Sequence, residues 1–398
     1  MLYDTIALED HHLVSFGEKT PLVVERGSGI DVWDVSGRHY LDFTAGLAVT
    51  SLGHAHPVIV KALIEQAGKI LQNPDSGLTY APSRARLLAQ LVRILPQPLH
   101  RFFFANSGAE ANDAALKLAR KITGRKKIVS MMRSFHGRTI GATSVTGQPI
   151  QRDRYAVLVP YCTFIPYNNV SAALRAIDDE TAAVIVEPVQ GEGGVWVPEP
   201  GYLPQLSGMC RKKGALLIVD EIQTGFWRTG PAFASIAQGV IPDFLTMAKG
   251  IAGGFPFGAV AVSEAAAAKI EPGDHGGTYC GNPLGCAVAA ATIEHLLAVD
   301  IESSVKRVGE HCMKRLIGLQ QTFPTIVKEV RGCGLLLAME IFREEIAGRI
   351  HREALSRGLI LNIKHGKIIR IFPALTITEK ELDVGIEILE EAIKVIIR

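Results

Sequence analysis

Two short apolar runs, each ending in one reactive side chain, constrain the fold of this chain more than any other feature. Residues 215–219 are rich in leucine and β-branched side chains and lead into Asp220. Residues 244–248 lead into Lys249, and three glycines follow by position 254. Runs of this kind are typical of parallel strands buried on both faces of a sheet. Because ligands bind at the carboxyl ends of such strands, we expect an acid and an amine at one rim of one sheet.

An acid and a lysine at one rim suit pyridoxal phosphate. A lysine holds the aldehyde of this cofactor, and a carboxylate against the ring nitrogen keeps the ring protonated and electron-withdrawing. An apolar run that ends in Asp220-Glu221 also resembles the magnesium-binding strand of a P-loop ATPase. The string G-x-x-x-x-G-K-[ST] that a P-loop requires is absent, however. The dinucleotide fingerprint G-x-G-x-x-G is absent too, which argues against a Rossmann dehydrogenase.

The residues around these two runs resemble the class III aminotransferases, which are pyridoxal phosphate enzymes of fold type I. The resemblance rests on Leu-Ile-Val-Asp-Glu-Ile-Gln-Thr-Gly at 217–225, Arg-Thr-Gly at 228–230 and Ala-Lys-Gly at 248–250. It covers nearly the whole chain, from about Gly29 to the end. The family includes acetylornithine, ornithine and 4-aminobutyrate aminotransferases. The resemblance implies an α/β fold: a large, mainly parallel, doubly wound sheet domain plus a smaller α+β C-terminal domain.

The length of 398 residues also favours two domains, because a single hydrophobic core rarely grows this large. We expect an N-terminal segment at 1–48 that contributes to the small domain and to dimer contacts. The large cofactor-binding domain follows at 49–290 and the small α+β domain at 291–398. Strand and helix patterns mix in this last part, and a capping box at Thr378 and Glu381 predicts the start of the final helix.

Composition excludes several other classes of protein. The net charge is +2 and no basic run is longer than that at 125–127, so we expect no nucleic-acid partner. No apolar run approaches the roughly 20 residues that span a bilayer, and residues 1–4 do not resemble a signal peptide. The six cysteines are scattered, and His54 and His56 lack a third ligand nearby, so we expect no metal site. Reduced thiols in a cytoplasmic protein are the simplest account.

A strand–turn–helix pattern predicts a site for the cofactor phosphate. Residues 101–105 have a strand pattern, an Asn-Ser-Gly turn follows, and alanines recur at helical spacing from Ala109 onward. Free N–H groups and the positive end of the dipole make a helix N-terminus an anion site. By resemblance to the family's Ser-Gly-Ala-Glu-Ala-Asn string, Ser107, Gly108 and Ala109 form the phosphate cradle.

The resemblance also assigns the other cofactor contacts. Phe135 stacks on the pyridine ring, with His136 beside it, and Gln223 contacts the ring hydroxyl next to Ile222. Thr278 reaches the cofactor phosphate of the neighbouring subunit. The resemblance therefore implies a homodimer with shared active sites, or a dimer of such dimers.

Three charged residues are candidates for substrate binding, together with Gly277. Arg138 resembles the family's anchor for a substrate carboxylate, since a planar guanidinium forms two parallel hydrogen bonds with it. Arg370 lies within an apolar run, where a buried cation needs a partner, and matches the arginine that binds an α-carboxylate. Glu192, by itself an ordinary loop glutamate, resembles the gating glutamate. That residue pairs with Arg370 in the donor half-reaction and moves aside for 2-oxoglutarate.

The implied reaction transfers an amino group from an ω-amino acid to 2-oxoglutarate, giving a semialdehyde and glutamate. Lys249 acts as the base and Asp220 supports the cofactor ring. We favour a donor of the acetylornithine or ornithine type. The string at 277–282 is closer to 4-aminobutyrate enzymes, and a specialised-pathway amine is the third option. An aminomutase or decarboxylase would also keep Lys249 and Asp220, whereas a non-catalytic relative would be expected to lose one of them.

Overall fold

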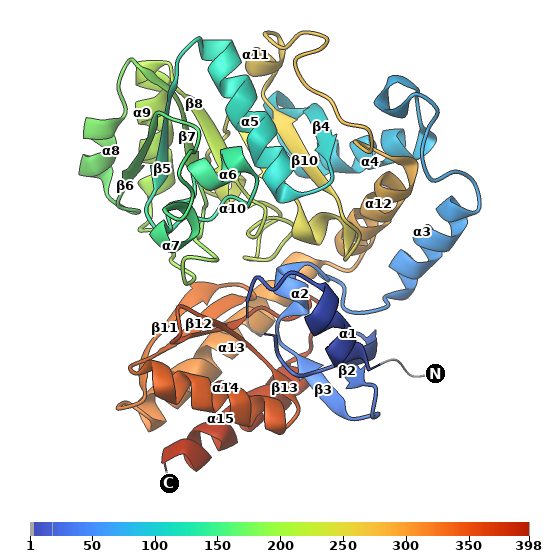
Figure 1. Ribbon diagram of the computed structural model, residues 1–398. Helices are drawn as coiled ribbons and strands as arrows, with labels where there is room; N and C mark the ends of the chain where they lie inside the picture. The colour runs from blue at the N-terminus through green and yellow to red at the C-terminus, as the bar shows by residue number, and fades with distance from the viewer. Residues whose placement is uncertain (1–3, 18, 398) are drawn as a thin grey trace.

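The computed structural model describes residues 4–17 and 19–397. Residues 1–3, part of the stretch on which the expectation of no signal peptide rests, lie outside this set. Figure 1 shows two bodies, one around a large sheet and one in which the N-terminal and C-terminal parts of the chain lie together. The α/β class with a large sheet domain and a smaller mixed domain is confirmed.

The large sheet has seven strands, and only one of them runs against the others. Strands β9, β8, β7, β5 and β6 run parallel to one another, while β10 is antiparallel to both β9 and β4. The expected mainly parallel sheet is therefore present. In spatial order its strands are β4 (Arg101–Ala105), β10 (Gly258–Val262), β9 (Phe244–Met247), β8 (Leu216–Asp220), β7 (Thr181–Val186), β5 (Lys127–Met131) and β6 (Cys162–Ile165).

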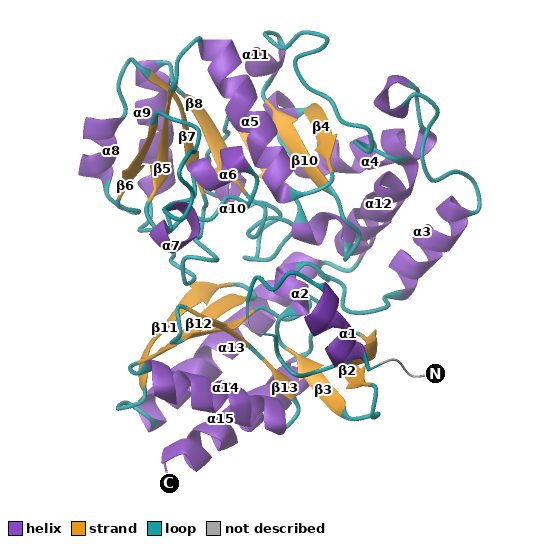
Figure 2. Cartoon of the chain, in the orientation of Figure 1, coloured by secondary structure: helices purple, strands orange, loops and turns teal. Residues whose placement is uncertain are grey.

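Helices cover both faces of this sheet, as Figure 2 shows. The alternation of side chains along β8 explains why both faces are apolar. Ile218 packs in the core beneath α5 (Gly108–Thr123), and Leu217 and Val219 pack in the core on the side of α9 (Tyr202–Lys213). The helices of this body are α3 (Pro57–Ala67), α4 (Pro82–Ile94), α5 (Gly108–Thr123), α6 (Ile140–Ser144), α7 (Pro149–Arg152), α8 (Val170–Ala176), α9 (Tyr202–Lys213), α10 (Ala234–Ala237), α11 (Glu264–Ala267) and α12 (Pro283–Ala298). Short 3₁₀ turns lie at Ser76–Leu78, Gln97–Leu99 and Lys249–Ala252.

The smaller body combines both ends of the chain. An N-terminal hairpin has its turn at Ser36-Gly37, and its second strand β3 pairs in parallel with β13 from the C-terminal part. The N-terminal strands β1 (Val24–Ser28), β2 (Asp31–Asp34) and β3 (His39–Asp42) thus form one sheet with β13 (Leu359–Ile360). A second sheet contains β11 (Val327–Cys333), β12 (Leu336–Ile341), β15 (Ile368–Ile371) and β14 (Asn362–Lys364). The helices are α1 (Thr5–His12), α2 (Ala45–Ala48), α13 (Ile301–Thr322), α14 (Glu344–Ser356) and α15 (Glu379–Ile397).

The predicted capping box forms at the start of α15, where Thr378 and Glu381 each accept a hydrogen bond from the backbone N–H of the other. The domain limits at 48/49 and 290/291 stay predictions. Helix α12 packs against α3 and α4 and continues through residue 290, so a limit after Ala298 suits this packing better.

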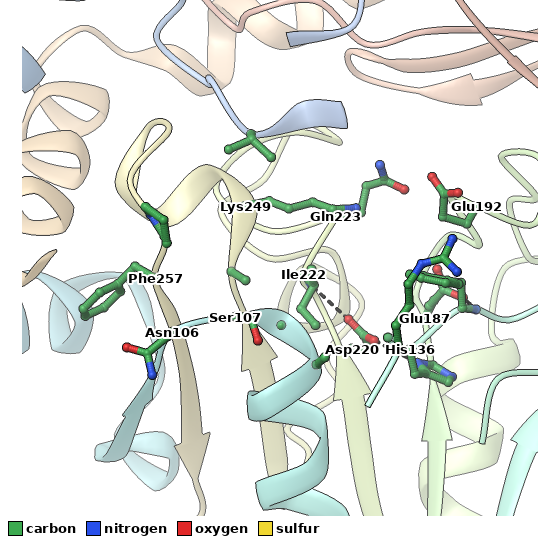
Figure 3. Close-up of a pocket in the computed structure, with 18 of the residues that line it drawn as sticks. Asn106, Ser107, His136, Glu187, Glu192, Asp220, Ile222, Gln223, Lys249 and Phe257 are labelled. Atoms are coloured by element: carbon green, nitrogen blue, oxygen red, sulfur yellow. Dashed lines mark hydrogen bonds and ion pairs between the residues drawn. The ribbon is translucent and has the colours of Figure 1, made fainter. Parts of the chain in front are cut away.

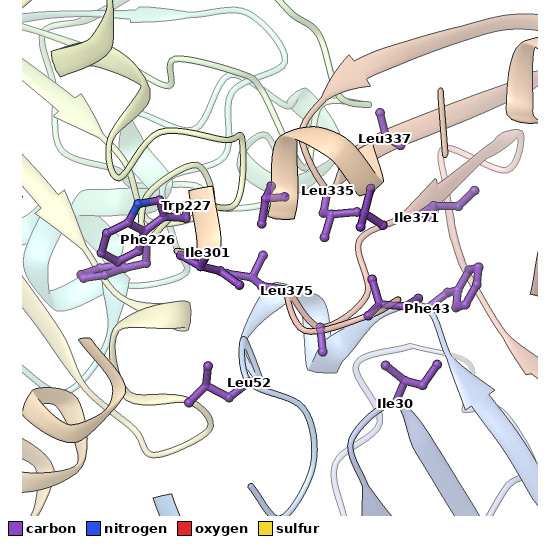
Figure 4. Close-up of a cluster of buried hydrophobic side chains, with 14 of the residues drawn as sticks. Ile30, Phe43, Leu52, Phe226, Trp227, Ile301, Leu335, Leu337, Ile371 and Leu375 are labelled. Atoms are coloured by element: carbon purple, nitrogen blue, oxygen red, sulfur yellow. The ribbon is translucent and has the colours of Figure 1, made fainter. Parts of the chain in front are cut away.

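One apolar cluster joins the two bodies. Figure 4 shows Phe226 and Trp227 from a loop of the large body beside side chains such as Leu335 and Leu375 of the small one. Ile369 and Ile371 of β15 belong to this shared core. Among residues 4–17 and 19–397, no single helix is long and apolar enough to cross a membrane. Helices α12 and α13 meet the requirements of length and apolar composition only as a pair, and they are bent by 72° at the break between them.

Candidate active site

Asp220 and Lys249 meet at one rim of the large sheet. Asp220 is the last residue of β8, Lys249 follows β9 by two positions, and these strands are parallel neighbours with Asp220 opposite Thr246. Both side chains line one cavity of about 460 Å³. Figure 3 shows the side chain of Lys249 extending across this cavity above Ile222 and Asp220. The backbone of Lys249 has a φ of +48°, a left-handed value that is uncommon outside glycine.

The Asp220 carboxylate is held by three donors. Its Oδ2 atom accepts hydrogen bonds of 2.8 Å from Asn112 Nδ2 and 2.8 Å from His136 Nδ1, and its Oδ1 atom accepts one of 3.0 Å from the Ile222 N–H. Asn112 also accepts a 2.8 Å bond from the hydroxyl of Thr246. All four side chains that take part, on Asn112, His136, Asp220 and Thr246, are buried. The carboxylate therefore has a fixed orientation.

The N-terminus of α5 opens into the same cavity. Ser107 caps the helix by accepting a 3.2 Å bond from the N–H of Glu110, and Glu110 accepts a 2.7 Å bond from the N–H of Asn106. A Cβ atom on Gly108 would lie 2.6 Å from Cδ1 of Ile222, closer than side chains tolerate. Glycine avoids this contact without a shift of the Ile222 side chain, and it leaves the backbone N–H groups of the first helical turn accessible to an anion.

Two buried polar atoms at the cavity lack a partner in the described part of the chain. They are Nε2 of Gln223 and Nε2 of His136. Buried polar groups are almost always hydrogen-bonded, so an unpartnered donor at a cavity suits a ligand with an acceptor oxygen. Gln223 thus fits the neighbourhood of a ring hydroxyl.

Glu187 is a further carboxyl at the cavity that the sequence motifs do not assign. It follows β7, and its two oxygens accept bonds of 3.0 Å from the N–H of Phe135 and 3.2 Å from the N–H of Gly191. Burial raises the pKa of Glu187 to about 7, with Asp220 adding to the rise and His136 opposing it. An acid at the end of a buried strand is the same signal that identified Asp220, and it would have identified Glu187.

Burial also lowers the pKa of Lys249, although the carboxylates of Glu192 and Asp220 act in the opposite direction. At the mouth of the cavity, Arg138 donates a 3.0 Å bond to Oε1 of Gln151. Its guanidinium carbon lies 5.7 Å from the ring centroid of Phe135. Arg138 therefore combines an exposed position with a place beside the predicted stacking ring.

Arg370 meets Glu192 across the boundary between the two bodies. The Nη1 atom of Arg370 on β15 lies 2.7 Å from Oε1 of Glu192, which belongs to the loop after β7. Arg370 also donates to Oδ1 of Asn362 at 2.8 Å and to the carbonyl of Gly191 at 3.1 Å. Its exposed fraction is 1%, so Glu192 is the partner that a buried cation in an apolar strand requires.

The predicted site residues fall into two groups. Eleven of them line the cavity: Ser107, Gly108, Ala109, Phe135, His136, Arg138, Glu192, Asp220, Ile222, Gln223 and Lys249. Among the described residues, the lining does not include Arg370, Gly277 or Thr278. Arg370 lies directly behind Glu192. The carbonyl of Thr278 accepts a 2.6 Å bond from Gln72 and a second bond from the hydroxyl of Ser76. The individual roles of all these residues stay predictions.

The sequence motifs also leave Asn112 and Lys364 unassigned. Asn112 is a fully buried polar residue on the alanine-rich face of α5, and such a residue in an apolar stripe is a usable signal. Lys364 donates a 2.7 Å bond to Oε2 of Glu192 from strand β14. No local pattern predicts that contact, because the two residues are joined only by the packing of the two bodies.

The doubly wound sheet, with a lysine and an aspartate beside one cavity at its rim, defines an α/β protein whose ligand site lies at the carboxyl ends of the parallel strands. The class-III aminotransferase family model matches residues 14–393, and the chain belongs to that family.

The chain is 42% identical over 390 residues to acetylornithine aminotransferase of Methanothermobacter thermautotrophicus, with 98% of each chain covered. It is 41% identical to succinylornithine transaminase of Salmonella paratyphi A, with 95% of this chain and 93% of that one covered. A structure of ornithine aminotransferase from Toxoplasma gondii, described as having pyridoxal phosphate at partial occupancy, superposes with a TM-score of 0.91. It has 32% identity and covers 98% of this chain and 94% of that one.

Proposed function

We propose that this protein is a pyridoxal phosphate-dependent aminotransferase that moves an amino group from an ω-amino acid of the acetylornithine or ornithine type to 2-oxoglutarate. The products are a semialdehyde and glutamate. One observation carries the proposal: Asp220 and Lys249 end adjacent parallel strands in a cavity that the N-terminus of α5 also enters. A ring nitrogen, an aldehyde and a phosphate on one molecule suit these three features.

The residues of the cavity fit the cofactor. Gly108 keeps the helix N-terminus clear for the phosphate, and the unpartnered Nε2 of Gln223 suits the ring hydroxyl. Asp220 would hold the ring nitrogen and Phe135 the face of the ring. When bound, the cofactor supplies an electron-withdrawing ring that weakens the C–H bond beside the substrate nitrogen.

Lys249 supplies the amine that holds the cofactor and then the base that moves the substrate proton. Because burial lowers the pKa of Lys249, a larger fraction of its amine is neutral near pH 7 than for a lysine in water. A neutral amine accepts a proton, whereas an ammonium does not. Asn112 and His136 keep the Asp220 carboxylate in position while this happens.

Glu192 and Arg370 explain how one site accepts two unlike substrates. The reacting carbon of an ω-amino donor has no carboxylate, so Arg370 would be an unpaired buried cation without the 2.7 Å contact to Glu192. Glutamate and 2-oxoglutarate have a carboxylate at this carbon, which takes the place of Glu192. Arg138 at the cavity mouth would hold the distal carboxylate in both cases.

The relatives support the choice of donor. The protein with 42% identity is named for acetylornithine and the protein with 41% identity for succinylornithine. These names favour an ornithine-type donor over 4-aminobutyrate, over a specialised amine and over aminomutase or decarboxylase chemistry.

All six cysteines are free, which suits the cytoplasm.

A homodimer with shared sites accounts for Gly277 and Thr278. The carbonyl of Thr278 is bonded to Gln72 and Ser76, so these two segments lie side by side and outside the chain's own cavity. Leu78, Tyr80 and Tyr279, on the same two segments, are exposed apolar side chains. Such a patch suits an interface with a second copy, in which Thr278 would reach the partner's phosphate site.

An amino-donor screen tests the proposed function. Purified holoenzyme is incubated with 2-oxoglutarate and acetylornithine, ornithine or 4-aminobutyrate, and glutamate is measured. We expect glutamate from an ornithine-type donor and none with Lys249→Ala. Product formed without 2-oxoglutarate, or carbon dioxide released in its absence, would instead indicate an aminomutase or a decarboxylase.

A further inference from the structure

The Glu192 carboxylate is bound by two cations rather than one. Its Oε1 atom lies 2.7 Å from Arg370 Nη1, and its Oε2 atom accepts a 2.7 Å hydrogen bond from Lys364 Nζ. The exposed fractions are 15% for the Glu192 side chain and 20% for Lys364. Arg370 alone would satisfy the need for a partner to a buried cation. The contact with Lys364 therefore holds Glu192 in place in addition to its contact with Arg370.

The geometry of β14 explains why this lysine reaches Glu192. Strand β14 pairs with β15 in antiparallel register, with Asn362 opposite Arg370 and Lys364 opposite Ile368. Residues two apart on a strand share a face. Asn362 thus binds the Arg370 guanidinium and Lys364, on the same face, binds Glu192. One short strand holds both members of the Glu192–Arg370 pair.

The local charges favour the observed arrangement. Burial alone would raise the pKa of Glu192, but the charges of Arg370 and Lys364 outweigh it and hold that pKa well below its usual range. Glu192 is thus a carboxylate near neutral pH. A partly buried, charge-assisted hydrogen bond is stronger than an exposed ion pair. The contact between Lys367 and Glu340 in the same hairpin is of the weaker kind, at 3.6 Å with Lys367 37% exposed.

We propose that Lys364 is a positioning residue that holds Glu192 on Arg370 and so sets the preference of the site between two substrate classes. It favours substrates whose reacting carbon has no carboxylate, and it opposes those that must displace Glu192. The reason is that both oxygens of Glu192 are bound at once, so a substrate carboxylate entering at Arg370 must compete with a carboxylate held by two cations. This inference rests on the proposed function, because it assumes that Glu192 moves between half-reactions.

The test compares Lys364→Met, Lys364→Arg and the matched control Lys367→Met as holoenzymes. Glutarate, a dicarboxylate that lacks the reacting group, is titrated calorimetrically, and single-turnover rates are measured with glutamate and with an ω-amino donor. We expect Lys364→Met to bind glutarate about tenfold more tightly, equivalent to about 1.4 kcal/mol. The preference for the ω-amino donor over glutamate should fall by a similar factor. Lys364→Arg and Lys367→Met should both match the wild type in glutarate affinity and in substrate preference.

Three outcomes would overturn the inference. Weaker glutarate binding in Lys364→Met would mean that Lys364 stabilises Glu192 after it leaves Arg370. Equal losses in both half-reactions, with a lower melting temperature, would mean a structural role only. Unchanged binding and preference would mean no role. Failure of the proposed function is separate: the wild type would then make no glutamate in the donor screen, while glutarate titration would still compare the variants.

Discussion

Asn112 Nδ2 donates a 2.8 Å hydrogen bond to Oδ2 of Asp220, which joins the helix that begins at the anion site to the strand that ends at the acid. The same nitrogen donates a 2.7 Å bond to the carbonyl of His136, and the amide oxygen accepts from Thr246. One buried side chain thus links α5 to β8, to β9 and to the loop after β5. A change at Asn112 should therefore act on stability and on chemistry together.

We expect Asn112→Leu to leave the carbonyl of His136, the hydroxyl of Thr246 and one position on Asp220 without a partner. A buried polar group that loses its partner costs about 1–3 kcal/mol. The melting temperature should fall, and turnover should fall by at least about tenfold because Asp220 is less well oriented. Thr246→Val is the control, since it removes only one of these bonds. Equal effects of the two substitutions would contradict the central position of Asn112.

A second prediction concerns the close contact between Gly108 and Ile222. Gly108→Ala places a Cβ atom 2.6 Å from Cδ1 of Ile222, so either the Ile222 side chain or the first turn of α5 must shift, and both border the cavity. We expect cofactor affinity, measured by fluorescence titration of the apo-protein, to fall by on the order of tenfold to hundredfold. Adding Ile222→Val removes the clashing methyl group and should recover part of the loss.

Gly208 provides the matched control for this change. It lies on helix α9, and a Cβ atom there would meet nothing within 4 Å. Gly208→Ala should leave cofactor affinity unchanged and increase stability by up to about 1 kcal/mol, as expected for alanine in a helix. If Gly108→Ala bound the cofactor as well as Gly208→Ala does, the cradle assignment would be wrong.

The main features of the fold follow from the sequence because short-range patterns encode them. The apolar runs before Asp220 and Lys249 are buried strands, and parallel packing places their ends at one rim. The hairpin at Ser36-Gly37 and the capping box at Thr378 depend on neighbours only two or three residues away. Strand β1 is not predicted because Val24–Ser28 is mostly exposed and carries no alternating apolar pattern.

The less predictable part of the site depends on contacts between distant segments. Lys364 meets Glu192 only because β14 of the small body packs over the loop after β7. The residues next to Lys364 in the sequence do not indicate that its partner is a glutamate of the other body. Arg370 is different, because a cation within an apolar strand indicates a buried ion pair. Family resemblance supplied the roles of Glu192 and Thr278, which residue patterns alone leave open.

A third prediction follows from the lowered pKa of Lys249. Below this folded-state pKa, the apo-protein must hold a partly buried ammonium, whereas the unfolded chain leaves it in water. Between that value and 10.5 the unfolded chain binds a proton that the folded one does not, so wild-type stability rises with pH. Apo Lys249→Met should therefore melt at a higher temperature than the wild type near pH 6. The difference should shrink steadily towards pH 10, and a difference that grew with pH would contradict the assigned sign.

A fourth prediction tests the shared site. Mixed dimers are made from Lys249→Ala subunits and Thr278→Ala subunits, neither of which should be fully active alone. If Thr278 serves the partner's cavity, each mixed dimer has one site with both changes and one site with neither. It should then recover about half of the wild-type activity. Mixed dimers that show no recovery would place Thr278 in the cavity of its own chain.

The last prediction concerns the pairing of Glu192 with Arg370. Removing one member of a buried ion pair leaves the other uncompensated, at a cost of about 3–5 kcal/mol. In Glu192→Ala this cost is present whenever the substrate has no carboxylate at Arg370. The ω-amino half-reaction should therefore slow by about a hundredfold or more, while the glutamate half-reaction is spared. In Arg370→Ala the substrate carboxylate loses its partner, so the glutamate half-reaction should slow and the ω-amino half-reaction should suffer less. Single-turnover rates measured separately for each half-reaction decide the matter, because a fixed structural ion pair would slow both halves equally in both variants.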